Sequence, residues 1–284
     1  MELIRAAADL TAAVQARRSS ASDVGLVPTL GALHDGHASL IRRARAERKT
    51  VVVSIFVNPR QFGPDEDLAR YPRDEARDLA LSAGLGADLV WAPSVDEFYP
   101  TGVELPDPDP GPVGEVLEGA ARPGHFAGVL AAVRRLFDVV GPSTAYFGEK
   151  DAQQLFLVRR MVERLELPVM LVACPTVRDP DGLALSSRNA YLSPEEREQA
   201  GCLFLALSEA AELARAGERD PAVVVAAMAR EVGATPLAAL DYAEVVDEAT
   251  FERPSEIVLP ARALIAARFP STRLIDNLRL PAAG

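Results

Sequence analysis

The sequence predicts an α/β protein, in which a domain with a doubly wound parallel sheet is followed by a smaller α+β domain. Three observations favour this fold class. Short apolar, β-branched runs alternate with helical stretches through about the first two thirds of the chain. These runs are continuous in hydrophobicity, as expected for parallel strands covered on both faces. Near residue 177 the pattern changes to Ala-rich helices and then to strands that alternate polar and apolar residues.

The elements of the first domain, residues 1–176, follow from these runs. Strands are expected at residues 24–27, 51–57, 87–91, 144–147 and 169–173. Helices are expected at residues 38–48, 73–83, 126–140 and 152–165. The proline-rich stretch 106–112 is interpreted as an irregular excursion within this domain, because the same alternation resumes after it. Strand, helix and strand in repetition predict a Rossmann-like doubly wound sheet.

The second domain, residues 177–284, begins with a turn-rich segment that contains Asp179-Pro180-Asp181-Gly182. Ser193 is expected to cap a helix that has Pro194 at its first position. Ala-rich helices continue to about residue 232, and strands are expected at residues 241–246, 262–267 and 272–278.

Composition excludes several classes of protein. The 284 residues, 49% hydrophobic and 25% charged, are typical of an ordinary soluble globular protein. No apolar run approaches the roughly 18 residues of a membrane span, and charges within the first ten residues argue against a signal peptide, so a cytoplasmic location is expected. The net charge of −11 argues against nucleic-acid binding. Cys174 and Cys202 form no Cys-x-x-Cys pair, which predicts buried thiols without a disulfide or structural zinc.

The segment His34-Asp35-Gly36-His37 follows a predicted strand and opens a predicted helix. Ligands of open α/β sheets bind at such strand ends, and a helix N-terminus favours phosphate. Two histidines three residues apart lie on the same side of the first helical turn and can reach one phosphate chain. Alternatively, the two histidines bind a metal ion, or Asp35 simply caps the helix.

A second polar segment, residues 147–154, also leads from a strand end into a helix. Lys150 offers a positive charge to phosphate, and Gln154 offers an amide to a substrate. The alternative is a purely local role, in which Asp151 and Gln154 form a capping pair.

Three further segments carry polar side chains. Ser186-Ser187-Arg188 suits a phosphate clamp on a loop, although the same residues are common on an ordinary surface. Residues 58–62, with Gln61, could read hydroxyl and carboxylate groups, or could form only a strand-ending turn. His125 could be only the residue that starts a helix. Because strand ends of a doubly wound sheet meet in one crevice, these segments together predict a nucleoside triphosphate site.

At this level of detail the sequence resembles the pantothenate synthetase family of the H-x-G-H nucleotidylyltransferases. The segment 27–37 resembles the H-x-G-H loop of that superfamily. Five further segments match the family pattern in order, namely residues 54–62, 71–73, 124–128, 147–154 and 181–189. The resemblance covers nearly all of the first domain and the junction between the domains.

The resemblance implies a ligase that activates pantoate with ATP as pantoyl adenylate, releases pyrophosphate, and then forms pantothenate and AMP with β-alanine. It implies catalytic roles for His34, His37 and Lys150, and binding of pantoate by Gln61 and Gln154, with Gln61 also near β-alanine. The residues it assigns to ATP are Leu30, Gly31, Ala32, Leu33, His34, Asp35, Gly36, His37, Gly148, Glu149, Lys150, Asp151, Val177, Leu185, Ser186, Ser187 and Arg188. It also implies Mg²⁺ on the triphosphate and a homodimer; the metal ligands are not identified, with Asp78 as a weak candidate.

The chain departs from the family pattern at a few positions. Leu30 and Leu185 stand where methionine is common, which is a nearly volume-conserving exchange. Ala152 replaces a common tyrosine, and Arg77 replaces a residue that is often acidic, which argues against a metal role for that stretch.

Two rival functions stay open at this stage. One is a transferase that acts on a phosphorylated alcohol, for which basic residues would be expected in place of Gln61 and Gln154. The other is a nucleotide-binding regulatory module without catalysis, which would not need Lys150 together with the Ser-Ser-Arg segment.

Overall fold

The structure is a computed structural model that describes residues 1–19 and 23–281. Its contacts divide the chain into two compact units. The first unit comprises Met1–Glu149 and Gln153–Pro175, and the second comprises Lys150–Ala152 and Thr176–Gly284. The short segment Lys150–Ala152 therefore belongs by its contacts to the second unit, although both of its chain neighbours belong to the first.

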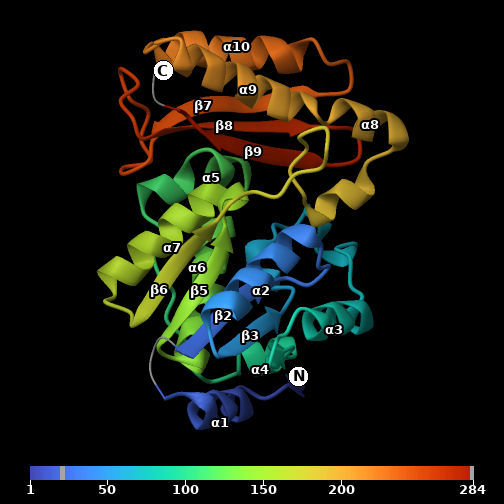
Figure 1. The fold of residues 1–284 in the computed structure, drawn as a ribbon, viewed down its shortest axis with the longest axis vertical. Helices are drawn as coiled ribbons and strands as arrows, with labels where there is room; N and C mark the ends of the chain where they lie inside the picture. Colours follow the sequence, from blue (N-terminus) through green and yellow to red (C-terminus); the bar gives the residue numbers. More distant parts are fainter. Residues whose placement is uncertain (20–22, 282–284) are drawn as a thin grey trace. The chain divides into compact units, whose positions relative to one another are not determined.

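The first unit is built on a six-stranded parallel sheet in the order β1-β4-β3-β2-β5-β6 (Figure 1). The strands are β1 (Glu2–Ile4), β2 (Val24–Thr29), β3 (Thr50–Ile55), β4 (Leu89–Trp91), β5 (Ser143–Gly148) and β6 (Val169–Cys174). From β2 the chain proceeds outward through β3 and β4, then returns to the other side of β2 as β5 and β6. This reversal between β2 and β5 confirms the predicted doubly wound sheet.

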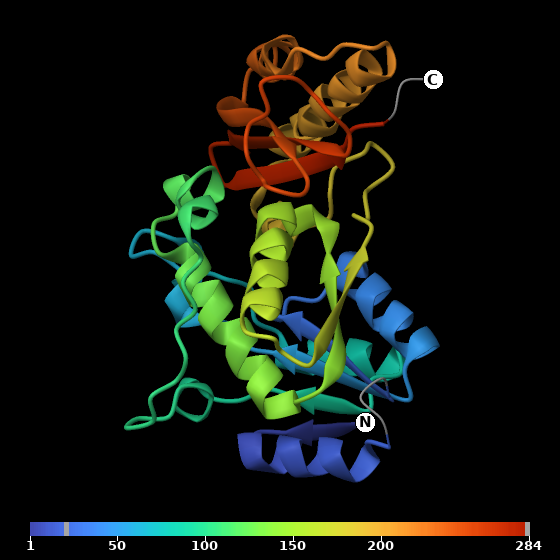
Figure 2. The ribbon, with the colours of Figure 1, turned by 90° about the vertical axis from the view of Figure 1, so that its left-hand side faces the viewer.

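Seven α-helices accompany this sheet within the described residues. They are α1 (Ala7–Arg17), α2 (Asp35–Glu47), α3 (Glu75–Gly84), α4 (Val95–Phe98), α5 (Glu118–Ala121), α6 (His125–Val140) and α7 (Ala152–Arg164). Short 3-10 turns lie at Pro59–Gln61, Asp67–Ala69, Pro112–Glu115 and Glu149–Asp151. In Figure 2, α6 and α7 lie on one face of the sheet and α2 on the other.

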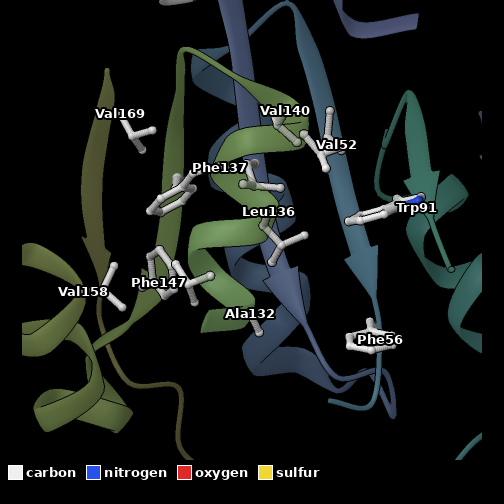
Figure 3. Packing of buried hydrophobic residues seen from close by; sticks show 14 of the residues in the cluster. Val52, Phe56, Trp91, Ala132, Leu136, Phe137, Val140, Phe147, Val158 and Val169 are labelled. Carbon is white, nitrogen blue, oxygen red and sulfur yellow. The ribbon is translucent and has the colours of Figure 1, made fainter. Parts of the chain in front are cut away.

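Two hydrophobic cores explain why the predicted strands are continuous apolar runs. In β3, Val52 packs into the core beneath α1, α6 and α7, whereas Val51 and Val53 pack into the core beneath α2. The same alternation occurs in β5, where Phe147 faces the first core and Tyr146 the second. Figure 3 shows side chains of α6 packed against this first face, among them Leu136 and Phe137. Because successive side chains point to opposite faces and both faces are buried, the middle of each strand is a continuous apolar run.

The sequence analysis missed β1 and α1. β1 has only three residues, and Glu2 and Leu3 are exposed, so it lacks the apolar run that marks the other strands. It forms by pairing in register with β4, from Glu2 opposite Leu89 to Ile4 opposite Trp91. A partner so distant in the sequence leaves no local pattern.

The second unit is a small α+β domain, as predicted. The antiparallel sheet contains β7 (Ala239–Asp247), β8 (Ala261–Arg268) and β9 (Arg273–Arg279) in that order. Its helices are α8 (Pro194–Gln199), α9 (Cys202–Arg215) and α10 (Pro221–Gly233), preceded by a 3-10 turn at Ser187–Tyr191. Ser193 caps α8, with Pro194 at the first helical position, as expected. Alanines of α9 and β8 supply much of a separate core.

The two cysteines and the apolar character of the helices were also considered from the sequence. Cys174 and Cys202 are buried free thiols. Within the part of the chain that the structure describes, no helix has both the length and the apolar character needed to cross a membrane.

Candidate active site

The loop between β2 and α2 carries the H-x-G-H segment at the carboxyl end of a central strand. Thr29, the last residue of β2, is buried, and its Oγ1 donates to the Ser54 carbonyl at 2.6 Å. The Gly31 N–H donates in turn to Thr29 Oγ1 at 3.2 Å. Gly31 and Ala32 then take positive φ angles of 82° and 49°, which reverse the chain toward α2. For Ala32 this left-handed conformation is strained, so other contacts must hold it.

Asp78 of α3 holds this strained loop. Its two carboxylate oxygens accept the N–H groups of Ala32 and Leu33, each at 2.8 Å, and the residue is only 1% exposed. Burial raises the pKa of the Asp78 carboxyl, and the hydrogen bonds from Leu33 and Ala32 oppose that rise. The sequence analysis considered Asp78 as a candidate metal ligand. In the structure both of its oxygens bond to the loop, which assigns it a positioning role.

The two histidines of the segment lie side by side at the start of α2. Their ring centroids are 4.1 Å apart, which confirms that they share one side of the first turn. His34 is the N-cap, because its Nδ1 accepts the Gly36 N–H at 3.1 Å. The alternative that Asp35 caps the helix is therefore wrong, since Asp35 is the first helical residue. Leu33 is fully buried in the core beneath α2, so only its backbone can contribute to a ligand site.

Gln61 lies in the 3-10 turn after β3, and Asn58 orients its side chain. Asn58 Nδ2 donates to Gln61 Oε1 at 3.1 Å and to the Gly128 carbonyl at 2.9 Å. Asn58 Oδ1 accepts the Tyr99 hydroxyl at 2.9 Å, and burial raises the pKa of Tyr99 to about 12, so the phenol stays protonated. With its oxygen bonded to Asn58, Gln61 keeps its Nε2 hydrogens to donate to a ligand.

His125 and Arg122 hold the backbone of Gln61. The Gln61 carbonyl can only accept, so His125 Nδ1, at 2.8 Å from it, carries the proton. His125 Nε2 then accepts from Arg122 Nη1 at 3.0 Å, which leaves the imidazole neutral. Burial, followed by the Arg122 charge, lowers the pKa of His125 to about 4, in agreement with this tautomer. His125 does start α6, as considered from the sequence, but its ring also positions Gln61.

Glu66 neutralises Arg122 in this cluster. Its two oxygens face Arg122 Nη2 at 2.5 Å and Nε at 2.9 Å. Burial acts to raise the pKa of Glu66, but the hydrogen bond and the charge of Arg122 prevail and lower it. A second arginine, Arg60, lies over the ring of Tyr99 at 4.1 Å from its centroid. Both arginines next to Gln61 therefore already have partners.

A third strand end, that of β5, leads to Gly148 and Glu149 and then into α7. Gln154 is half-buried in the first turn of α7. Its neighbour Gln153 is buried and has a structural role, because it bonds to Val113 O at 2.7 Å, Val116 O at 2.9 Å and Glu118 N at 3.1 Å. Sequence reasoning missed this difference, since both residues read as polar positions at a helix start.

Within the first unit, neighbouring strands bring three of the predicted segments together. β3, β2 and β5 are adjacent and parallel, so the loops with Gln61, with His34 and His37, and with Gln154 leave the same edge of the sheet. The Phe56 N–H, just after β3, donates to the carbonyl of Thr29 at the end of β2 at 3.2 Å. This bond directly joins the loop with Gln61 to the loop with the two histidines.

The second unit carries the remaining predicted residues, which are Lys150, Asp151, Val177, Leu185, Ser186, Ser187 and Arg188. Lys150 Nζ lies 3.5 Å from Asp151 Oδ1. The Leu185 N–H donates to the Val177 carbonyl at 3.0 Å, which closes the loop that leads to the Ser-Ser-Arg segment. Ser186 caps the following 3-10 turn by accepting the Arg188 N–H at 3.3 Å.

Comparisons with known proteins agree on one family. The family model described as pantoate-beta-alanine ligase matches residues 2–279 of the chain. A protein named pantothenate synthetase from Roseiflexus castenholzii is 52% identical over 267 residues, which cover 94% of this chain and 96% of that protein. Another of the same name, from Moorella thermoacetica, is 48% identical over 280 residues, or 99% of each chain.

Solved structures show the same similarity. The pantothenate synthetase of Thermus thermophilus superposes with a TM-score of 0.93 at 49% identity, covering 99% of this chain and 100% of that one. A pantoate-beta-alanine ligase from Francisella tularensis, described as complexed with beta-gamma ATP and beta-alanine, has a TM-score of 0.80 at 31% identity, covering 98% and 97%.

Proposed function

The chain belongs to the pantoate–β-alanine ligase family, whose enzymes form pantothenate, and we propose that it does so in two steps driven by ATP. In the first step a pantoate carboxylate oxygen attacks the α-phosphorus of ATP, and the bond to the departing pyrophosphate breaks. In the second step the β-alanine amine attacks the acyl carbon of pantoyl adenylate. AMP leaves with the electron pair of the broken bond, and the amine loses a proton.

The surroundings of Gln61 favour a carboxylic acid, rather than a phosphorylated alcohol, as the second substrate. Asn58 holds its Oε1, so that its Nε2 donates, and donors suit the carboxylate and hydroxyl oxygens of pantoate. A phosphorylated alcohol would instead favour arginines that are ready to bind phosphate. Arg122 is paired with Glu66, and Arg60 stacks on Tyr99. Gln154 and, for β-alanine, Gln61 complete the proposed contacts.

The residues that we propose for ATP act on its phosphates. His34 and His37, placed together at the start of α2, would donate to phosphate oxygens on which negative charge develops. Fixed donors at such positions usually contribute the largest part of catalysis. Lys150 and the Ser186-Ser187-Arg188 segment would bind the departing pyrophosphate. The related protein described with bound beta-gamma ATP and beta-alanine supports both ligands.

Mg²⁺ is proposed as a companion of ATP. Among the described residues, no group of three or more His, Cys, Asp or Glu side chains is placed to hold a metal ion. We propose that phosphate oxygens and water supply most of its ligands, as is usual for Mg²⁺ bound with a nucleotide, where it neutralises phosphate charge. The homodimer implied by the family and the cytoplasmic location expected from the composition stay predictions.

Exchange of labelled pyrophosphate into ATP tests the first step by itself. With Mg²⁺ and pantoate, and without β-alanine, the folded protein should exchange label; with β-alanine in place of pantoate it should not. No exchange with pantoate would refute the adenylate mechanism. Exchange that depends on a phosphorylated alcohol would identify a transferase, and ATP binding without any exchange would identify a regulatory module.

A further inference from the structure

Lys150 is attached to the far end of the chain. Asn277 of β9 donates from Nδ2 to the Lys150 carbonyl at 2.7 Å, across 127 residues of sequence. Both residues belong to the second unit. The backbone of Lys150 is therefore bonded to the sheet of the second unit, although the strand that precedes it in the chain, β5, belongs to the first.

Arg262 fixes which way the Asn277 amide points. Its Nη1 lies 2.6 Å from Asn277 Oδ1, and a guanidinium can only donate. The amide oxygen must therefore face Arg262, and the NH₂ group must face the Lys150 carbonyl. Asn277 is only 3% exposed, so water does not compete readily for either bond.

The preceding residue, Asp276, holds the loop that leads to the Ser-Ser-Arg segment. Its carboxylate accepts from Arg178 Nη1 at 2.5 Å and from Nη2 at 2.9 Å. Arg178 Nη1 also donates to the Gly182 carbonyl at 3.0 Å, and its Nη2 to the Asn277 carbonyl at 3.2 Å. Arg178 thus connects the turn at residues 178–182 to two neighbouring residues of β9, Asp276 and Asn277.

The charges around Asp276 are consistent with a buried connection of this kind. Burial raises the pKa of its carboxyl, while Arg178 and, more weakly, the Lys150 ammonium oppose that rise. The Asp276 side chain is 2% exposed. A buried carboxylate that lost Arg178 would be left without its main partner, which is strongly unfavourable.

We propose that Asp276 and Asn277 are positioning residues for adenylate formation, which fix Lys150 and the root of the Ser186-Ser187-Arg188 loop to one pair of neighbouring residues on β9. Asn277 holds the Lys150 backbone directly, and Asp276 holds the loop through Arg178. The inference rests on the proposed function, in which these two segments bind the pyrophosphate of ATP. The new element is that β9 sets the distance between Lys150 and the Ser186-Ser187-Arg188 loop. Phosphate binding then depends on the side chains of Asp276 and Asn277, which do not touch the nucleotide.

The variant Asn277→Asp tests this with little change of shape. It keeps an oxygen for Arg262 but turns a second oxygen toward the Lys150 carbonyl, where a donor is needed. We expect kcat for pantoate-dependent pyrophosphate exchange to fall about tenfold, the scale of losing one well-placed hydrogen bond. The KM for pantoate should stay within about twofold, because Gln61 and Gln154 belong to the first unit.

Asp241→Asn is the matched control on the same sheet. Asp241 accepts from Arg273 Nε at 2.6 Å, at the first residue of β9 and four positions before Asn277. This change also interconverts Asp and Asn and weakens a link between strands, but it is remote from Lys150. Its kcat should stay within about twofold of the parent. If it lowered kcat as much as Asn277→Asp does, general weakening of the sheet would explain both variants and the inference would fail.

A double-mutant cycle with Lys150→Ala separates positioning from structural damage. If Asn277 acts through Lys150, Asn277→Asp should cause little further loss in the Lys150→Ala background. A full, multiplicative loss there would overturn the inference, as would an Asn277→Asp single variant with parental kcat. Lys150→Ala with parental exchange would instead refute the proposed role of Lys150. Should Asn277→Asp not fold, Asn277→Ser is the replacement, because its short hydroxyl cannot reach both partners and the same outcomes apply.

Discussion

Gly128 offers a sharp test of how the first unit holds Gln61. It lies in the first turn of α6, where the helix meets the 3-10 turn Pro59–Gln61 almost backbone to backbone. A Cβ at this position would overlap the Arg60 carbonyl and would lie 2.7 Å from the Gln61 nitrogen. Ordinary contacts of such an atom begin near 3.4 Å, so Gly128→Ala must push the two segments apart.

The size of the effect follows from the contacts at this point. An added methyl group in a tightly packed interior costs about 2 kcal/mol, because neither backbone can move independently. Separating the segments also stretches the 2.9 Å bond from Asn58 Nδ2 to the Gly128 carbonyl. Gln61 should shift by a sizeable fraction of an ångström. A misplacement of about 1 Å can cost about a hundredfold in rate, and we expect kcat/KM for pantoate to fall by that order.

Gly84→Ala provides the matched control. Gly84 is the last residue of α3, and a Cβ there would meet nothing within 4 Å. The same substitution should stabilise the protein by about 0.5 kcal/mol, since alanine favours helix, and leave exchange unchanged. Urea unfolding and pyrophosphate exchange measure both variants. If Gly128→Ala unfolds and exchanges like Gly84→Ala, the close approach of α6 to the Gln61 turn does not position the substrate.

Three further predictions concern side chains of the first unit. Asp78→Asn leaves one N–H of the loop facing an NH₂ group, so the rate of pyrophosphate exchange should fall about tenfold. The control is Asp74→Asn, which keeps a cap on the same helix and should change neither pyrophosphate exchange nor stability in urea. His37→Ala should lower exchange by about two orders of magnitude in folded protein, and parental exchange would make His37 merely structural. The pKa of His125 is lowered to about 4, so the unfolded chain takes up its proton first as pH falls below its ordinary value. Urea titrations should therefore show a stability loss of about 3 kcal/mol between roughly pH 6.5 and pH 4, and His125→Asn should remove that component.

The sequence analysis identified the doubly wound sheet because both faces of its strands are buried. Burial on both faces removes polar positions from a strand, and a run such as Val51-Val52-Val53 is visible without any knowledge of its neighbours. The loops after β2, β3 and β5 were predictable for the same reason, since each begins where an apolar run stops. β1 was missed because its pairing with β4 is not encoded in a local run.

The residues that support the site were much less visible. Asp78 looks like any acidic residue on an exposed helix face, and Gln153 looks no different from Gln154. What distinguishes them is the group opposite each side chain, such as the Ala32 N–H for Asp78 and the Glu118 N–H for Gln153. A hydrogen bond between residues 35 or 46 positions apart leaves no periodic pattern in the sequence.

The sequence by itself predicted the histidines, the lysine and the glutamines proposed for the site, because their residue types and their places at strand ends are local properties. Only the tertiary structure decided what holds them. It assigned His34 rather than Asp35 as the helix cap, made His125 a neutral support for Gln61, and attached Lys150 to Asn277. The physical reason is that residue type determines which donors, acceptors and charges a side chain offers. Its orientation depends on partners that folding brings from elsewhere in the chain.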